Sequence, residues 1–193
     1  MLAALRRCRV PIASIAVTYA LAVVVGAVMV HAGNGLALDT RDSVVGQAHA
    51  SDPASRALAN GRPFEAGVVD FARNVVLSAV PITIAGLAVV VPYPFVAFRG
   101  WVGGIVSVDG RHTSRLADPR EALYYLVTLV LQLVPSSLTA GAGVALGLAY
   151  VRRRPGEATL LGLPRVALLD VTVVYALALP LFFVASMWEF LAR

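Results

Sequence analysis

Long apolar runs separated by short polar segments dominate the chain. The run 11–30 carries no charge and is long enough to cross a membrane, because a spanning helix needs about 20 apolar residues. Three arginines precede it, which predicts a first transmembrane helix with a cytoplasmic N-terminus. A cleaved signal peptide is the alternative, but its apolar core has about 7–15 residues, and the small-x-small site at 48–50 lies too far downstream. We therefore predict an uncleaved helix.

A polar segment, 31–73, follows and is predicted to lie outside the membrane. Asp52-Pro53 forms an N-cap followed by proline, and Asn60-Gly61 is a typical helix stop. These signals predict one short helix between them.

The end of this segment carries an amphipathic pattern. Its apolar residues recur at spacings of three and four, which places them on one helix face: Phe64, Val68, Phe71 and Val75. The neighbouring charged residues fall off that face. The pattern predicts an amphipathic helix that lies in the membrane interface and leads into the next span.

Prolines interrupt the next apolar stretch, 74–108. It is too long for one crossing, and Val-Pro-Tyr-Pro at 91–94 breaks it, since proline removes a backbone donor and disfavours helix in the residue before it. We predict a full span over 74–91 and a shorter helix over 95–108. This shorter helix and the next apolar stretch, 122–150, either both cross the membrane or both dip in and return.

The second overlong stretch, 122–150, is predicted to be a broken helix as well. Asp118-Pro119-Arg120-Glu121 precedes it as a capping box, and an arginine triplet at 152–154 ends it. The run 165–191 then predicts a last span. The helix breaks are assigned to Pro92, Pro94 and Pro135. The expected fold is all-α: one integral membrane domain with about five membrane segments, two of them broken.

Composition agrees with a polytopic membrane protein. Hydrophobic residues make up 59% and charged residues 14%, against roughly 45–50% and 25% in soluble domains, and the mean hydropathy is +0.79. A soluble domain of 193 residues has too little interior for so much apolar side chain. The net charge of +5 comes from arginines clustered beside the spans, which is a topological pattern. We therefore predict no nucleic-acid partner.

Glycines four residues apart occur in both interrupted stretches, and such faces let helix backbones approach closely. The glycines assigned to helix packing or a partner interface are Gly100, Gly103, Gly104, Gly141, Gly143 and Gly147. A constant offset of 43 residues relates Val91-Pro92 to Val134-Pro135 and the first glycine pair to the second. This offset suggests an internal repeat of broken helices, with coincidence as the alternative in a chain rich in these residues.

Polar residues within the spans are costly and are candidates for function. The possible polar site comprises Arg99, Gln132, Ser136, Thr139 and Asp170. We expect Arg99 to reach the interface, or else to pair with an anionic lipid or partner. We expect Asp170 to reach water or the 152–154 cluster and to form a structural ion pair, with a proton site as the alternative. The polar residues around Pro135, which also include Ser137, are expected to satisfy carbonyls that the proline frees, with a polar substrate or ion as the alternative.

No catalytic or metal-binding motif is found. His31, His49 and His112 lack metal-ligand spacing, and the chain has no nucleophile elbow and no phosphate-binding loop. The single cysteine excludes an internal disulfide. We predict no enzymatic activity, no cofactor and no metal.

The order of these features resembles the stage II sporulation protein M family. The resemblance covers residues 71–189 and rests on Asn74 opening the second helix, a glycine-rich third segment, Pro135 before a glycine-rich fourth segment, and Glu189 near the end of the last helix. The chain departs from the family at Arg99-Gly100, where an Asn-Gly is common, and at 133–139, which lacks a His-Gly…Glu pattern. The resemblance implies a membrane scaffold, since the family's sporulation members anchor external peptidoglycan-degrading partners.

Two functions follow as hypotheses. The first is a non-catalytic scaffold or accessory subunit in the bacterial cytoplasmic (inner) membrane, surrounded by membrane lipid and assembled with other membrane proteins in a larger complex or homo-oligomer. The second is a membrane subunit of a transporter or channel that uses the proline-broken helices. The glycine faces favour the first, and the broken helices favour the second.

Overall fold

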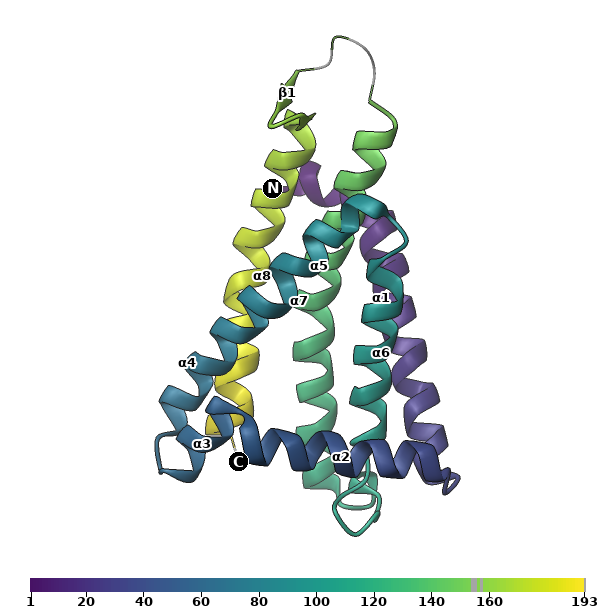
Figure 1. The fold of residues 1–193 in the computed structure, drawn as a ribbon, viewed down its shortest axis with the longest axis vertical. Coiled ribbons are helices and arrows are strands. Elements are labelled where there is room, and N and C mark those ends of the chain that lie inside the picture. The colour runs from purple at the N-terminus through teal and green to yellow at the C-terminus, as the bar shows by residue number, and fades with distance from the viewer. Residues whose placement is uncertain (154–155, 157, 193) are drawn as a thin grey trace.

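The computed structural model describes residues 1–153, 156 and 158–192, with every side chain of these except that of His49. Long helices run between a narrow end, which holds the N-terminus, and a broad end, which holds the C-terminus (Figure 1). The single long helices are α1 (Leu2–His31), α6 (Pro92–Ile105), α7 (Pro119–Val151) and α8 (Arg165–Leu191). One further long segment is built from four consecutive elements: α4 (Pro63–Arg73), the π-helix η1 (Asn74–Ala79), α5 (Val80–Ala85) and the 3₁₀-helix η2 (Gly86–Ala88).

Short elements close the two ends. At the narrow end β1 (Thr159–Leu160) pairs antiparallel with β2 (Leu163–Pro164). At the broad end α2 (Gly35–Ser51) lies across the long helices, followed by α3 (Pro53–Ala59), and the 3₁₀-helix η3 (Arg115–Ala117) precedes α7 (Figure 1).

Four helical segments in the described part of the chain are long and apolar enough to cross a membrane: Leu2–His31, Pro63–Ala88, Pro119–Val151 and Arg165–Leu191. The prediction of an all-α membrane protein is confirmed in this form. α6 has 14 residues and covers about 21 Å at 1.5 Å per residue, which is less than the hydrocarbon thickness of about 30 Å. The fifth predicted segment is therefore shorter than a complete span.

α4 covers the amphipathic helix predicted before the second span and leads into that span as expected, while its location in the membrane interface stays a prediction. α4 continues directly into η1, α5 and η2, so the second segment is one helical unit. The predicted apolar face is divided: Phe64 is 62% accessible, whereas Phe71 and Val75 are partly buried against the core cluster that includes Phe182 of α8. α4 also packs on α8 through small residues. Gly67 and Ala66 are buried there, and Gly67 lies against Met187.

The predicted break near Pro92 is confirmed, and the break at Pro135 is wrong. Val89 has a φ of 56°, which turns the chain, and α6 begins at Pro92, where a missing N–H costs no helical bond. Pro94 lies in the first turn of the same helix. α7 in contrast runs through Pro135, which is buried among its neighbours. Prolines are tolerated inside membrane helices because surrounding groups make up for the lost bond.

This difference also removes the structural basis for an internal repeat. The two prolines related by the offset of 43 residues occupy unlike positions, one at the first turn of α6 and one in the middle of α7.

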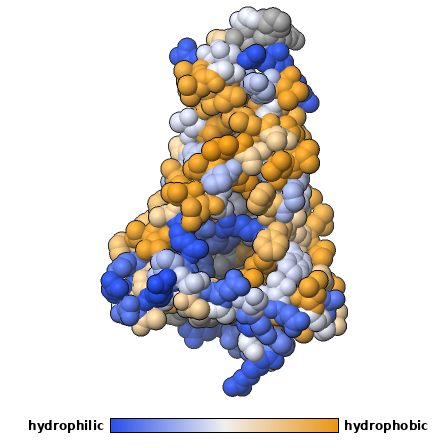
Figure 2. Space-filling model, in the orientation of Figure 1, coloured by the Kyte–Doolittle hydropathy of each residue, from blue (hydrophilic) through white to orange (hydrophobic). Residues whose placement is uncertain are grey.

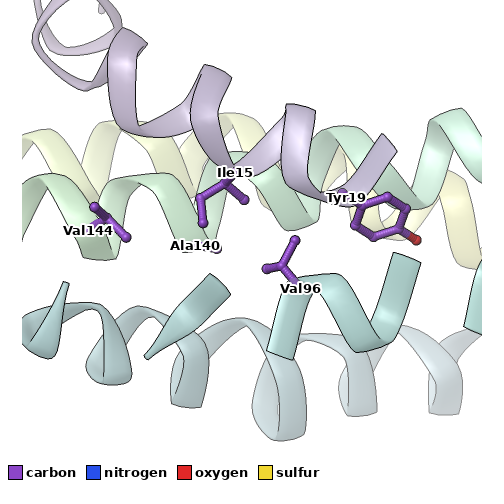
Figure 3. Close-up of a cluster of buried hydrophobic side chains, with 5 residues drawn as sticks. All are labelled: Ile15, Tyr19, Val96, Ala140 and Val144. Carbon is purple, nitrogen blue, oxygen red and sulfur yellow. The ribbon is translucent and has the colours of Figure 1, made fainter. Parts of the chain in front are cut away.

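The apolar core lies where α1, α6 and α7 meet (Figure 3). Ile15 and Tyr19 of α1 pack with Val96 of α6 and with Ala140 and Val144 of α7. α7 occupies the centre of the bundle, because it packs against α1 on one side, α8 on another, and α5 with η2 on a third.

Two helix caps predicted from the sequence are confirmed. The carboxylate of Asp52 accepts a hydrogen bond from the backbone N–H of Ala54, at 3.2 Å, at the start of α3. Asp118 accepts from the N–H groups of Arg120 and Glu121, at 2.8 and 3.0 Å, at the start of α7. Each cap satisfies donors that a helix N-terminus leaves free.

The predicted external segment also contains α2, which the sequence analysis missed. Its cap is the side chain of Asn34, which accepts from the N–H of Ala37 at 3.1 Å. The guanidinium of Arg41 is buried and donates to Asp42 at 2.8 Å, and Asp42 also bonds His112 of the α6–α7 loop at 3.1 Å. These hydrogen bonds, that of the arginine first, lower the pKa of Asp42.

The same loop is fastened to the end of α1. The imidazole of His31 bonds the hydroxyl of Ser114 at 2.8 Å. Within the loop, Asp109 accepts from the N–H groups of Arg111 and Thr113, both at 2.8 Å, and these backbone donors lower its pKa. The α6–α7 loop therefore lies at the same end of the molecule as α2.

Candidate functional site

The candidate glycines pack inside the chain. A Cβ placed on Gly100 would lie 2.5 Å from the carbonyl oxygen of Tyr19, and one placed on Gly143 would lie 2.5 Å from the carbonyl oxygen of Thr83. Cβ positions on three others would also collide with backbone atoms of neighbouring helices: Gly104, Gly141 and Gly147. Gly103 faces a side chain, that of Leu129.

These contacts assign the glycines to internal packing between α6 and α1 and between α7 and its neighbours. Where two backbones are already in contact, no room remains for a helix of another protein. The alternative assignment, a glycine surface free for a partner, does not fit the five glycines packed against backbone.

A polar cluster crosses the bundle at Arg99 of α6. The guanidinium donates to the hydroxyl of Ser78, to the side-chain carbonyl of Asn74 at 2.7 Å, and to that of Gln132 at 3.5 Å. These bonds hold the side chain of Arg99 against η1 and α7, and the prediction that it reaches the interface stays a prediction. Gly100 beside it packs on Tyr19, near the middle of α1.

Two carboxylates extend the cluster without touching Arg99. Asn74 donates through its amide to Asp70 at 2.8 Å, and Ser186 of α8 donates to the same carboxylate at 2.7 Å. On the other side, the amide of Gln132 donates to Glu189 of α8 at 3.3 Å. One connected set of hydrogen bonds therefore joins α4, η1, α6, α7 and α8.

The π-helix η1 carries the two strongest partners of Arg99. Val80 donates its N–H to the carbonyl of Val75, five residues back, and Pro81 then lacks the next donor. The wider turn accommodates this missing bond in the middle of the span. Single π-turns inside helices are frequent at functional sites. Here the π-turn spans Asn74 and Ser78, which both face the guanidinium.

The charge of Arg99 is not balanced by a direct ion pair. No carboxylate in the described part of the chain lies within 4.0 Å of its guanidinium nitrogens, and its Nε makes no hydrogen bond to the described residues. Its three partners are a hydroxyl and two amides, which are neutral. A guanidinium inside a membrane is expensive and usually pairs with an acid or faces a cavity.

The surface next to the cluster is hollowed. Figure 2 shows hydrophilic side chains crossing the apolar face between α4 and α6, above α2. Arg99 itself is only partly buried.

The other members of the predicted polar site lie elsewhere. Thr139 donates to the carbonyls of Pro135 and Ser136, at 3.1 and 3.2 Å, within α7. The hydroxyls of Ser136 and Ser137 are both buried, and neither has a hydrogen-bond partner in the described part of the chain. The carbonyl that Pro135 frees is that of Leu131, four residues before it, and the bonds of Thr139 go to other carbonyls. The expectation that these hydroxyls satisfy the freed carbonyl is therefore wrong.

Asp170 forms an ion pair, but with a different partner from the predicted one. Arg7 of α1 donates to both carboxylate oxygens, through Nε at 2.6 Å and Nη2 at 2.5 Å. The predicted partner was the arginine cluster at 152–154, of which Arg154 is outside the described residues. This pair ties α1 to α8 at the narrow end, far from Arg99.

The sequence contains a signal for the cluster that the pattern of apolar runs does not reveal. Asp70, Asn74 and Ser78 are spaced by four residues, which places them in one stripe along a helix. Ser186 and Glu189, three residues apart on the last span, form a second stripe. Two polar stripes on apolar helices indicate a shared polar contact in the membrane.

Comparisons with protein-family models, curated proteins and solved structures find no match for this chain. The resemblance to the stage II sporulation protein M family stays a hypothesis based on the sequence.

Proposed function

We propose that this chain is a non-catalytic membrane subunit that binds an anionic group at Arg99, inside the membrane. The supporting observation is a partly buried arginine whose three direct hydrogen-bond partners are neutral, with the carboxylates of Asp70 and Glu189 one side chain further along the same network. An anion at Arg99 would add a direct charged partner that the described residues do not supply. Binding of this kind matches the transporter or channel hypothesis, in which polar side chains inside the bundle contact the solute.

The proposal includes an orientation. The narrow end carries the N-terminal arginines and Arg152–Arg153, and its acidic residue Asp170 is paired with Arg7. The broad end carries a mixture of acidic and basic residues. Under the positive-inside rule the narrow end is cytoplasmic. The α6–α7 loop then lies outside with α2, and α6 is a short fifth crossing rather than a re-entrant segment.

The internal packing of the glycines weakens the scaffold hypothesis. The glycine faces were its main support, and they are filled by α1, α5 and η2. The chain still assembles with other membrane proteins under the present proposal, as the binding subunit of a complex. What changes is the residue that carries the function.

Anion binding to the purified protein tests the proposal. The thermal unfolding midpoint is measured in phosphatidylcholine nanodiscs while three anions are added separately: inorganic phosphate, acetate and oleate. We expect at least one anion to raise the midpoint of the wild type, and Arg99→Gln to abolish the increase.

Arg62→Gln is the matched control. It removes the same charge from an exposed arginine that pairs with Glu65 at the broad end, so it should leave the increase intact. If no anion stabilises the wild type, or if both variants respond alike, the proposal is wrong.

A further inference from the structure

We infer that Asp70 of α4 takes up a proton when an anion binds at Arg99, a coupling that rests on the proposed function and adds the regulation of the same site. Three observations carry it. Asp70 is one side chain away from Arg99, its carboxylate has an oxygen free for a proton, and the charges around it leave Arg99 as its compensating cation.

A single amide separates the carboxylate of Asp70 from the guanidinium of Arg99. Asn74 donates to Oδ2 of Asp70 at 2.8 Å and accepts from Nη2 of Arg99 at 2.7 Å. This amide orientation is fixed, because a guanidinium only donates and an ionised carboxylate only accepts. Asn74 is 9% accessible, so little water screens one charge from the other. Asp70 therefore compensates the charge of Arg99 without occupying the place of a direct partner.

The second carboxylate of the network is connected less closely. Gln132 accepts from Arg99 at 3.5 Å and donates to Glu189 at 3.3 Å. Glu189 also lies two residues before the end of α8, at the broad end of the molecule. The proton is therefore assigned to Asp70, and Glu189 provides the matched control.

The carboxylate of Asp70 can accept a proton without losing its hydrogen bonds. Its two donors, Asn74 and Ser186, both reach Oδ2. Oδ1 accepts no hydrogen bond from the described residues and is not fully buried. A proton on Oδ1 leaves both existing bonds in place, so no rearrangement of α4 against α8 is needed.

The charged groups that act on Asp70 come from three elements. Arg73 on the same helix is already paired with Asp52 at the start of α3, which leaves Arg99 of α6 as the compensating cation. α8 and η1, which also pack against α4, present a neutral hydroxyl and a neutral amide to the carboxylate. Asp70 and Arg99 together carry no net charge. A monovalent anion at Arg99 adds one negative charge, and a proton on Asp70 removes it, which avoids an uncompensated charge in surroundings of low dielectric.

The pH dependence of anion affinity tests this coupling. Phosphate, acetate and oleate are each titrated against the unfolding midpoint in phosphatidylcholine nanodiscs, from about pH 5 to about pH 8. Asp70→Asn has the shape of the protonated side chain and keeps an oxygen for both donors. We expect the ratio of the wild-type dissociation constant to that of Asp70→Asn to increase with pH, by up to about tenfold for each pH unit. Ionisation of the ligand affects both proteins alike and cancels in this ratio. Glu189→Gln should keep the pH dependence of the wild type.

Proton uptake gives a direct second measurement. When a stabilising anion is added in weakly buffered solution at about pH 8 with a pH indicator, the wild type should take up about one proton more per bound anion than Asp70→Asn. A ratio that does not change with pH, equal uptake by the two proteins, or loss of uptake in Glu189→Gln overturns the coupling and leaves anion binding at Arg99 intact. Should Asp70→Asn fail to fold, the wild type and Glu189→Gln decide alone, since missing uptake in either overturns the coupling. If no anion binds to the wild type, the proposed function itself is wrong.

Discussion

Two neighbouring glycines of α6 provide a direct measure of how closely this helix packs on α1. A Cβ on Gly100 would lie 2.5 Å from the backbone carbonyl oxygen of Tyr19, whereas ordinary contacts begin at 3.4 Å. A Cβ on Gly103 would first meet the end of the Leu129 side chain, at 3.1 Å. Gly100→Ala therefore pushes two backbones apart by up to about 1 Å, while Gly103→Ala needs only a small rotation of a leucine.

The expected magnitudes follow from this geometry. Forcing extra volume into a packed core costs about 1–3 kcal/mol, and a gap of 0.5–1 Å forfeits roughly a quarter to a half of each dispersion contact across it. Replacing glycine by alanine in a helix returns up to about 1 kcal/mol in both variants, so this gain cancels in the comparison. We expect Gly100→Ala to be less stable than Gly103→Ala by about 2 kcal/mol.

The assay is reversible unfolding in mixed micelles with increasing dodecyl sulfate. Tryptophan fluorescence is a suitable signal, because the indole of Trp101 in α6 contacts the sulfur of Met29 in α1, at 3.3 Å. Far-UV circular dichroism serves as the second probe. Equal free energies of unfolding for the two variants, or a Gly100→Ala protein as stable as the wild type, would refute the close backbone approach.

Three further predictions concern the two ends of the molecule. Asp170→Asn should lower the unfolding midpoint because it breaks the bidentate pair with Arg7, and exchanging the two residues should recover part of the loss; an unchanged midpoint in the single variant contradicts a stabilising pair. The arginine before Asp42 lowers the pKa of its carboxyl from 3.8, so the hydrogen bond to Asp42 that holds the α6–α7 loop is fully present above pH 3.8 and is lost as the pH falls through the lowered pKa. Amide exchange in the loop, corrected for the intrinsic rate, should therefore rise below about pH 4. A corrected rate that does not change with pH argues against this support. In a chain without its native cysteine, Arg111→Cys should react with an impermeant thiol reagent on intact cells and Arg153→Cys only after permeabilisation; the opposite result reverses the proposed orientation.

Local signals in the sequence predicted the elements whose ends depend on their own residues. The caps at Asp52 and Asp118 need only the backbone a few residues ahead, and the turn before Pro92 needs only the conformational limits of proline. The apolar runs likewise identified the long helices by length. α2 escaped because it has no apolar stripe, and its buried Arg41 is covered by residues from the distant α6–α7 loop.

The candidate site was less predictable, because partner choice depends on how the helices pack. Arg7 and Asp170 are 163 residues apart, and their ion pair requires α1 to lie beside α8. The same holds for Arg99, whose partners come from η1 and α7. Spacing can show that a polar stripe exists on a helix. It does not show which other helix that stripe will face.

The shortness of α6 has a consequence for the membrane around the protein. Its apolar wall is about 21 Å high, which is roughly 9 Å less than a typical hydrocarbon layer. If α6 crosses the membrane as proposed, lipids beside it compress or tilt, at a fraction of a kcal/mol for each ångström of mismatch. Thinner bilayers would reduce this elastic cost, and so would contact with another protein that covers the thinned region. Under that proposal the protein prefers thin membranes, and a neighbour that shields α6 gains stability from relaxed lipid as well as from its own contacts.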